Sequence, residues 1–119
     1  MNSVQIIGRL TKDPEWSQTR GGTDVCKLRL AVPRPPRGGR EQSPVYVDVT
    51  VYGGRAEPVA LYMAKGRLVA VSGRLEYAEW RAKDGSARSK HEVVADRVEF
   101  LDPPKDRGAG DADQQADVA

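Results

Sequence analysis

One stretch of the sequence, Val45–Tyr52, constrains the fold more than any other part of the chain. Valine stands at every odd position in it, and the even positions carry tyrosine, aspartate, threonine and tyrosine. Successive side chains of a β-strand point to opposite faces, so this alternation predicts a strand whose valines line a core. Tyr46 and Tyr52 would then share the outer face, where flat ligands could stack on their rings. Cross-strand packing of the two rings is the alternative interpretation.

Length and charge indicate a small domain with a mildly basic body. With 119 residues, of which 39% are hydrophobic, the chain can bury one modest core. Residues 103–119 hold four acidic and two basic residues, which leaves 17 basic and 13 acidic residues in the remainder. A basic body of this kind suits a polyanionic ligand. The terminal segment lacks aromatic residues and is rich in Gly, Asp, Gln and Ala, so we predict a disordered acidic tail.

The composition also argues against several classes of protein. No apolar run approaches the roughly 20 residues of a membrane-spanning helix, and the N-terminus lacks the features of a signal peptide, so we expect a cytoplasmic protein with no membrane partner. The single cysteine, Cys26, and the single histidine, His91, exclude an intramolecular disulfide and argue against a zinc site. Asp48 has no evident acidic partner with which to hold magnesium, which argues against a nuclease. We predict no catalysis and no cofactor.

Hydrophobic alternation predicts four further strands and one helix. The strands cover residues 4–10, 24–32, 67–80 and 88–101, and the helix covers residues 57–65. Cys26 falls on the apolar face of its strand, which favours a core role over a redox or intersubunit role.

Particular residues mark the ends and bends of these elements. Gly66 is expected to cap the helix in the left-handed conformation, and Gly73 is expected to mark a bulge or a sharp bend. In the last strand, Val94, Val98 and Phe100 are predicted to share one face.

Two connections between the predicted strands are long or basic. Residues 33–44 contain three arginines among prolines and glycines, so this loop either follows a phosphate backbone or forms a solvated hairpin tip. Residues 81–87 form a hairpin turn around the Asp84-Gly85 pair. Five strands, with one short helix between the third and the fourth, are typical of an all-β OB-fold barrel, which binds oligonucleotides on its sheet face. We assign this domain to residues 1–102.

Between residues 3 and 102 the chain resembles the bacterial single-stranded DNA-binding proteins. The residues that carry the resemblance, in order and at the family's spacing, are Gly8-Arg9-Leu10, Asp13-Pro14-Glu15, Tyr52-Gly53, Tyr62, Lys65, Gly66, Gly73-Arg74-Leu75 and Trp80. The resemblance implies an OB-fold homotetramer in the bacterial cytoplasm, associated with the nucleoid. It would coat single strands regardless of sequence during DNA replication, recombination and repair.

The resemblance also implies a set of binding residues. Its stacking aromatics fall on Tyr46, Tyr52 and Trp80, while Trp16 and Tyr77 are assigned to structural packing, with stacking as the alternative. Phosphate contacts are predicted from basic residues of the strands and of the connections between them, namely Arg9, Arg29, Arg34, Arg37, Arg55, Arg74, Arg81 and Lys83. Lys27, Arg40, Arg88 and Lys90 complete the wider set of basic candidates.

Two features depart from the family pattern. The aromatic residue that the family carries in the loop after the second strand has no counterpart in residues 33–40, where arginine could stack instead. The chain also ends without the family's acidic run and terminal proline-phenylalanine. We therefore do not expect the tail to recruit replication and repair proteins, and both a short specialised form and a truncated chain could explain its ending. The alternative function is an OB-fold module that binds a protein partner or structured RNA.

Overall fold

The computed structural model describes residues 1–102, so the predicted tail, residues 103–119, lies outside the described residues. Its elements are β1 (Val4–Leu10), β2 (Glu15–Gln18), β3 (Asp24–Val32), β4 (Val45–Tyr52), the 3₁₀ turn η1 (Gly53–Arg55), α1 (Ala56–Tyr62), β5 (Leu68–Arg81) and β6 (Ala87–Phe100). The five predicted strands are confirmed to within one residue at each end. No helix of residues 1–102 has the length and apolar character to cross a membrane.

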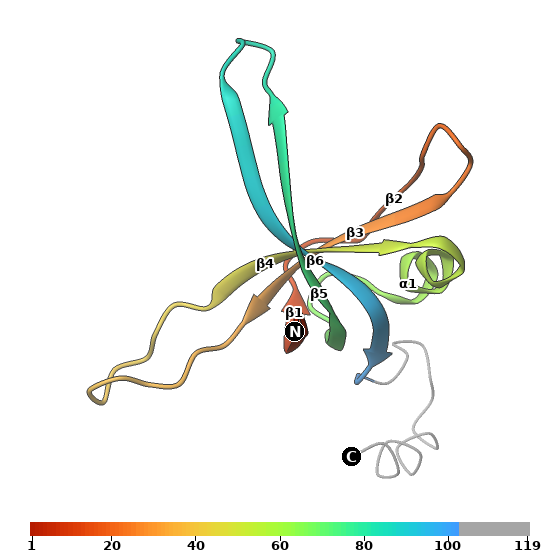
Figure 1. Cartoon of the computed structure of the whole chain (residues 1–119). Coiled ribbons are helices and arrows are strands. Elements are labelled where there is room, and N and C mark those ends of the chain that lie inside the picture. The colour runs from red at the N-terminus through yellow and green to blue at the C-terminus, as the bar shows by residue number, and fades with distance from the viewer. Residues whose placement is uncertain (103–119) are drawn as a thin grey trace, which may run out of the picture.

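The strands form one sheet that closes on itself. The sheet order is β1-β5-β6-β4-β3-β2, and β1 also pairs with β3, which completes a ring of five strands (Figure 1). Closure occurs where Arg9 and Leu10 of β1 lie opposite Ala31 and Leu30 of β3. This ring, with one helix between β4 and β5, confirms the all-β OB fold.

A sixth strand, β2, lies outside the ring and was not predicted. It pairs only with β3, on its open edge, and all four of its residues are exposed. Because β2 is short and buries no side chain, its sequence lacks the apolar alternation by which the other strands were identified.

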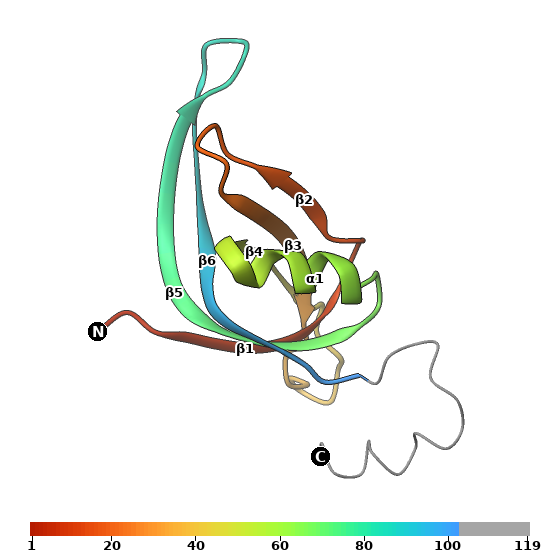
Figure 2. The same ribbon diagram turned by 90° about the vertical axis from the view of Figure 1, so that its right-hand side faces the viewer.

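The helix α1 lies across one end of the ring (Figure 2). It buries Ala56 and Val59 against the core and ends at Tyr62, three residues earlier than predicted. Gly66 is therefore not the helix cap. With φ of 90° it forms instead the turn in which the Arg67 amide donates to the Ala64 carbonyl, a backbone conformation that favours glycine.

The core lies inside the ring and consists mainly of small aliphatic side chains. The most deeply buried side chains are Leu30, Val49, Val51, Val59, Val69, Val71 and Cys26. Cys26 is fully buried, as predicted for a core role, and burial raises the pKa of its thiol to about 11. The thiol is therefore protonated at neutral pH and unreactive as a nucleophile.

A β-bulge separates the two halves of β5 and β6. Ser72 lies opposite Arg97, but Gly73 lies opposite Ala95, so Asp96 is the extra residue on β6. The strands approach so closely here that a Cβ on Gly73 would lie 2.1 Å from the Val94 carbonyl oxygen. The predicted bulge or bend at Gly73 is thus confirmed.

The bulge also overturns one prediction about β6. Its extra residue reverses the alternation of side chains, so Val93 and Ala95 join the core cluster, against which Val98 and Phe100 pack. Val94 instead pairs with Thr50 and Arg74 on the outer side. Val94 therefore does not share a face with Val98 and Phe100.

Candidate nucleic-acid interface

The tyrosines of β4 stand on the outer side of the barrel, as the alternation predicted. Tyr46 and Tyr52 are 53% and 46% exposed, whereas Val49 and Val51 on the other parity are buried. The strand pairs with β3 along its whole length, without a register shift, so its parity holds from end to end. We use the term aromatic face for the outward side chains of this region, namely Lys27, Arg29, Tyr46, Asp48, Tyr52, Arg74, Trp80, Arg88, Lys90 and Glu92.

Arg29 links the first ring of this face to a charge. Its guanidinium carbon lies 5.2 Å from the centroid of the Tyr46 ring, which is a cation–π distance. Arg29 lies opposite Asp48 in the β3–β4 ladder, and its Nη1 is 3.2 Å from Asp48 Oδ1. The cation is thereby held over one tyrosine ring and beside an acid.

The bulge in β6 brings a second strand of cations onto the same face. Lys90 Nζ lies 3.7 Å from Asp48 Oδ2, so the basic side chains of β3 and β6 converge on one carboxylate of β4. Two residues farther along each strand, the buried Thr50 hydroxyl of β4 donates a hydrogen bond to the Glu92 carboxylate of β6. These contacts fix how the outer face of β6 lies against β4.

A hollow lies at the centre of the aromatic face. Its volume is 350 Å³, and it is lined by Lys12, Glu15, Lys27, Leu28, Arg29, Asp48, Val49, Thr50 and Lys90. Within residues 1–102 no hydrogen bond or ion pair holds the Lys27 side chain. A hollow with four cations and two carboxylates can receive an anionic group of modest size.

Arg74 occupies the same face, since it lies opposite Val94, which in turn pairs with Thr50 of β4. Its Nε donates to Glu76 Oε2 at 2.6 Å, and its Nη1 lies 3.7 Å from Asp96. The hydrogen bond to Glu76 raises the pKa of Arg74 further above its usual value, so the guanidinium is always charged.

Trp80 stands farther out, on the arm formed by the β5–β6 hairpin. It is 47% exposed and lies opposite Arg88 in the ladder. Because side chains alternate between the two sides of a strand, Trp80 lies on the same side of β5 as Arg74, while Arg81 lies on the opposite side. Arg81 Nη1 donates to the Gly85 carbonyl, so this predicted phosphate contact helps to close the hairpin turn.

The predicted turn at the tip of this arm is present. The Gly85 amide donates to the Ala82 carbonyl, and Gly85 has φ of 85°. Hydrogen bonds from the hydroxyl and amide of Ser86 lower the pKa of Asp84. Lys83 is exposed at the tip.

Arg9 lies beside the aromatic face but is already engaged. It is opposite Ala31, which in turn is opposite Tyr46, so the three side chains form one row across β1, β3 and β4. The Arg9 guanidinium donates to the Gly66 carbonyl and pairs with Asp102 at 3.2 Å. This arginine thus fastens the turn before β5 to the end of β6.

The loop arginines stand at one end of the barrel. Arg34 Nε donates to the Ser43 carbonyl, and the backbones of Arg37 and Arg40 pair across the loop. Arg9 and Arg34 line a hollow of 580 Å³ together with Ile7, Gly8, Ala31, Pro33, Pro36, Glu41, Gln42, Pro44 and Leu68. Arg55 is exposed at the end of η1.

The structure therefore groups some of the predicted residues and leaves others apart. Tyr46, Tyr52, Arg29 and Arg74 come together on the barrel, and Trp80 extends the same face along the arm. Lys27, Arg88 and Lys90 also belong to this face, although they were only in the wider set of basic candidates. Gly73 is the sequence signal from which Arg88 and Lys90 could have been predicted as phosphate contacts, because it marks the bulge that turns them outward.

Two of the other exposed aromatic residues, Tyr77 and Trp16, lie elsewhere. Tyr77 is on the other side of β5 from Trp80, and its ring centroid is 5.1 Å from that of His91. Trp16 lies opposite the buried Cys26, so it shares the inward side of its hairpin, yet it is half-exposed because β2 reaches past the core. Neither ring is part of the aromatic face.

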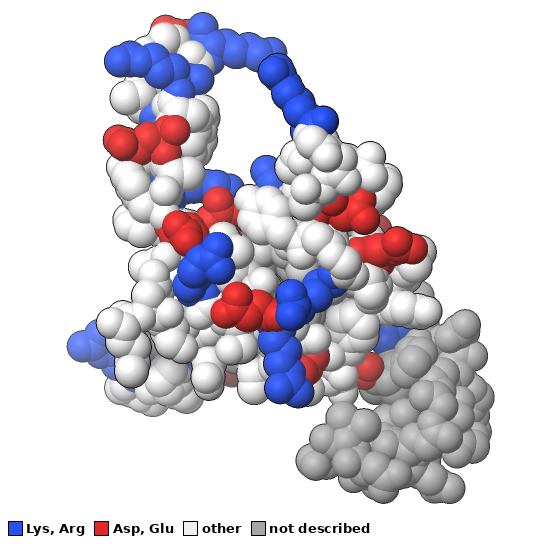
Figure 3. All heavy atoms as spheres, turned by 45° about the vertical axis from the view of Figure 1, so that its right-hand side comes forward, with Lys and Arg blue, Asp and Glu red and all other residues white. Residues whose placement is uncertain are grey.

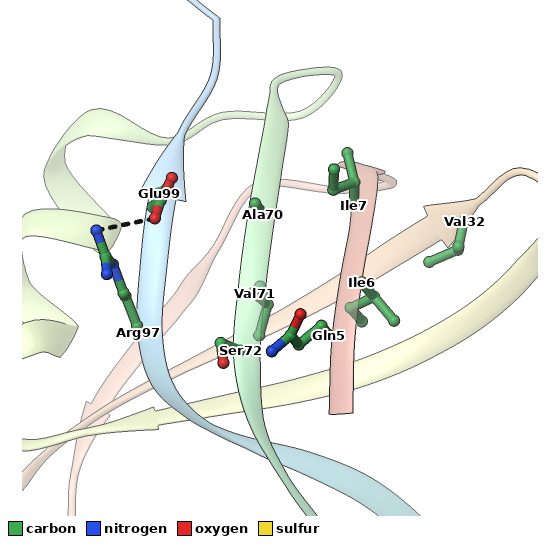
Figure 4. Close-up of a pocket in the computed structure, with 9 residues that line it drawn as sticks. All are labelled: Gln5, Ile6, Ile7, Val32, Ala70, Val71, Ser72, Arg97 and Glu99. Atoms are coloured by element: carbon green, nitrogen blue, oxygen red, sulfur yellow. Dashed lines mark ion pairs between the residues drawn. The ribbon is translucent and has the colours of Figure 1, made fainter. Parts of the chain in front are cut away.

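A further hollow lies on another flank of the barrel, over β1, β5 and β6, and Val32 of β3 is also in its lining (Figure 4). Its volume is 610 Å³, and its only charged side chains are Arg97 and Glu99, which pair at 2.9 Å. Although larger than the central hollow of the aromatic face, it contains no predicted stacking or phosphate-binding residue.

The distribution of charge distinguishes the arm from the barrel. In Figure 3, Lys and Arg side chains gather at the far end of the β5–β6 hairpin, whereas Asp and Glu alternate with them over the barrel. A polyanion would therefore meet cations on the arm and mixed charges nearer the tyrosines.

Comparison with known proteins agrees with this geometry. The chain is 46% identical to single-stranded DNA-binding protein 3 of Clostridium acetobutylicum, over 86% of this chain and 72% of the relative. It is 42% identical to protein 2 of the same organism, over 95% and 86% of the two chains. It is also 40% identical to single-stranded DNA-binding protein B of Bacillus subtilis, over 91% and 97%. Residues 1–101 match the model of the single-strand binding protein family, and the chain belongs to that family.

Proposed function

We propose that the protein binds single-stranded DNA without regard to sequence. Bases would stack on Tyr46, Tyr52 and Trp80, and phosphates would contact the basic side chains that flank them. The observation that carries this proposal is the common outward face of three half-exposed rings, one of which lies under an arginine. Residues 1–102 would form the binding domain, in which every base can use the rings because each has a π-face.

The predicted basic residues would contribute unequally to this binding. Arg29 and Arg74 lie on the aromatic face, and Lys27, Arg88 and Lys90 join them. Arg37, Arg55 and Lys83 would extend the track from exposed positions, whereas Arg9, Arg34 and Arg81 must first leave the groups that they hold.

Substitution of the rings tests the stacking. Each stacked base is worth about 1–3 kcal/mol on alanine substitution, so Tyr52→Ala and Trp80→Ala should weaken binding of oligo-dT by that amount. Tyr46→Ala should cost less, because Arg29 already covers one side of its ring. Fluorescence titration measures the three variants, and unchanged affinity in all three would refute the stacking.

The second test compares the affinity for single-stranded DNA with the affinity for duplex DNA. Oligo-dT should compete for the protein far better than a duplex of the same length. Equal affinity for the two, or no binding of oligo-dT, would favour the alternative module for a protein partner or structured RNA.

The biological setting follows from the family. We propose a bacterial, cytoplasmic, nucleoid-associated protein that protects single strands during DNA replication, recombination and repair, and that has no bond-breaking activity. Its relatives are proteins that bind single-stranded DNA by name.

Self-association is part of the proposal. Val4–Gly8 pairs with β5 on one side, but the other edge of β1 pairs with β3 only at Arg9 and Leu10. An open strand edge with an exposed Ile7 is suited to pairing with a second copy. We propose a homotetramer, and static light scattering should give four times the monomer mass.

A further inference from the structure

Asp48 lies at the centre of the aromatic face, where a negative charge is unfavourable for the binding of phosphates. It stands on β4 two residues from Tyr46 and four from Tyr52, on the same parity as both. Its side chain is 36% exposed, so the carboxylate is open to solvent. An acid at this position calls for a physical explanation.

The two oxygens of Asp48 hold two different cations. Oδ1 lies 3.2 Å from Arg29 Nη1 of β3, and Oδ2 lies 3.7 Å from Lys90 Nζ of β6. The carboxylate therefore bridges the strands on both sides of β4. Arg29 and Lys90 remain 44% and 36% exposed, so both can also be reached from outside.

A phosphate that approaches this hollow must compete with the carboxylate. Both are anions, and both would bind the same guanidinium and ammonium groups. While Asp48 is in place, part of the positive charge of Arg29 and Lys90 is already neutralised, and the carboxylate repels an incoming phosphate. Exposed ion pairs are weak, so the phosphate can displace the carboxylate at a modest cost.

We propose that Asp48 acts as a built-in competitor that sets the affinity for single-stranded DNA below what the cations of this face would give. This inference rests on the proposed function and identifies a residue that opposes it. A strand held less tightly at its centre can be released and exchanged more readily, since most differences in affinity are differences in dissociation rate.

The proposal predicts an unusual direction of change for a substitution within a binding site. Asp48→Asn keeps the shape of the side chain but removes its charge, and it should tighten binding of oligo-dT on the order of tenfold at low salt. If both freed cations gain a phosphate, the slope of log K against log salt should steepen by about 1.4, at about 0.7 per contact. The gain should then shrink about sevenfold when salt rises fourfold.

Three further variants isolate the competition from a general charge effect. Glu99→Gln removes one carboxylate from an exposed ion pair with Arg97, on the flank shown in Figure 4, and should leave affinity and slope unchanged. Asp48→Ser removes the same charge with a shorter side chain and should also tighten binding. In a chain that carries Arg29→Gln and Lys90→Gln, adding Asp48→Asn should produce no gain. Light scattering checks that all variants keep the same oligomeric state.

Each outcome of the titration supports or overturns the proposal. Weaker binding by Asp48→Asn would show that the carboxylate positions Arg29 and Lys90, and unchanged binding would show that phosphates do not reach them. If Asp48→Asn still tightened binding in the chain that carries Arg29→Gln and Lys90→Gln, the effect would come from net charge alone. The same conclusion would follow if Glu99→Gln tightened binding equally. If the unsubstituted protein binds no oligo-dT, the proposed function fails first and removes the basis of this inference.

Discussion

Trp80 and Tyr77 lie on the same strand, three residues apart, and are 47% and 53% exposed, yet they face opposite surroundings. Trp80 lies opposite Arg88 and shares its side of the arm with Lys90 and Arg74. Tyr77 packs against His91 and shares its side with Leu75, whose amide is held by Asn2. The difference shows that an exposed ring becomes a candidate for base stacking through the charges around it, because exposure is nearly equal on the two sides.

The bulge at Asp96 produces this difference. Without the extra residue, the alternation that points Val98 inward would carry Lys90 and Arg88 to the inward side as well. The bulge reverses the alternation, so the basic residues of β6 join the side of Trp80 and reach Asp48 on β4. Disturbing the bulge should therefore affect the contrast between the two sides of the arm more than any other change.

Substitution of Gly73 by alanine should have the largest effect. A methyl group there would lie 2.1 Å from the Val94 carbonyl oxygen, a backbone atom that cannot move without separating β5 from β6. We expect a loss of about 3 kcal/mol or more in the free energy of unfolding, measured by urea denaturation. Gly54→Ala is the matched control, since nothing lies within 4 Å of its added methyl group, and it should be nearly neutral. Equal stability of the two variants would mean that the close approach at the bulge is unimportant.

The next largest effect is expected from alanine substitution of the two rings of the arm, which should show that only one side of the arm binds DNA. Trp80→Ala should weaken binding of oligo-dT by about 1–3 kcal/mol, as expected for one lost stacked base, whereas Tyr77→Ala should leave the dissociation constant nearly unchanged. Both residues are half-exposed on one strand, so the structural effect of each truncation is comparable. If Tyr77→Ala weakened binding of oligo-dT more than Trp80→Ala, the side of the arm that carries Tyr77 would be the binding side.

Removal of one cation should give the smallest effect. Arg88→Gln takes away a single phosphate contact opposite Trp80, so the slope of log K against log salt should become shallower by about 0.7. Arg97→Gln removes the same charge from the flank of the barrel that holds Glu99, and its slope should match that of the unsubstituted protein. Titrations at several salt concentrations give both slopes, and identical changes in the two variants would mean that only net charge matters.

Local pattern was sufficient to predict most of the fold and the sides of β4 on which its side chains lie. In β4 the parity read from the sequence is the parity in the structure, because no bulge interrupts its pairing with β3. Tyr46, Tyr52 and the buried valines were therefore assigned correctly to their sides.

Other features depend on relations between strands and could not be read from one segment. The ion pairs of Asp48 join β3, β4 and β6, so they could not be inferred from the sequence of any one strand. Val94 was assigned to the wrong face because a single extra residue on β6 reversed the alternation. The strand β2 was missed because it is held by the open edge of β3 alone.

The proposed contact between the outward ring of Trp80 and the bases can be measured directly by tryptophan fluorescence. The chain contains only two tryptophans, and Trp16 lies on the inward side of another hairpin. Trp16→Phe leaves Trp80 as the single tryptophan, and its fluorescence should be quenched when oligo-dT binds. Trp80→Phe leaves Trp16, keeps an aromatic ring on the aromatic face, and should bind oligo-dT with little change in fluorescence. Quenching of Trp16 with no response from Trp80 would show that the bases do not stack on Trp80.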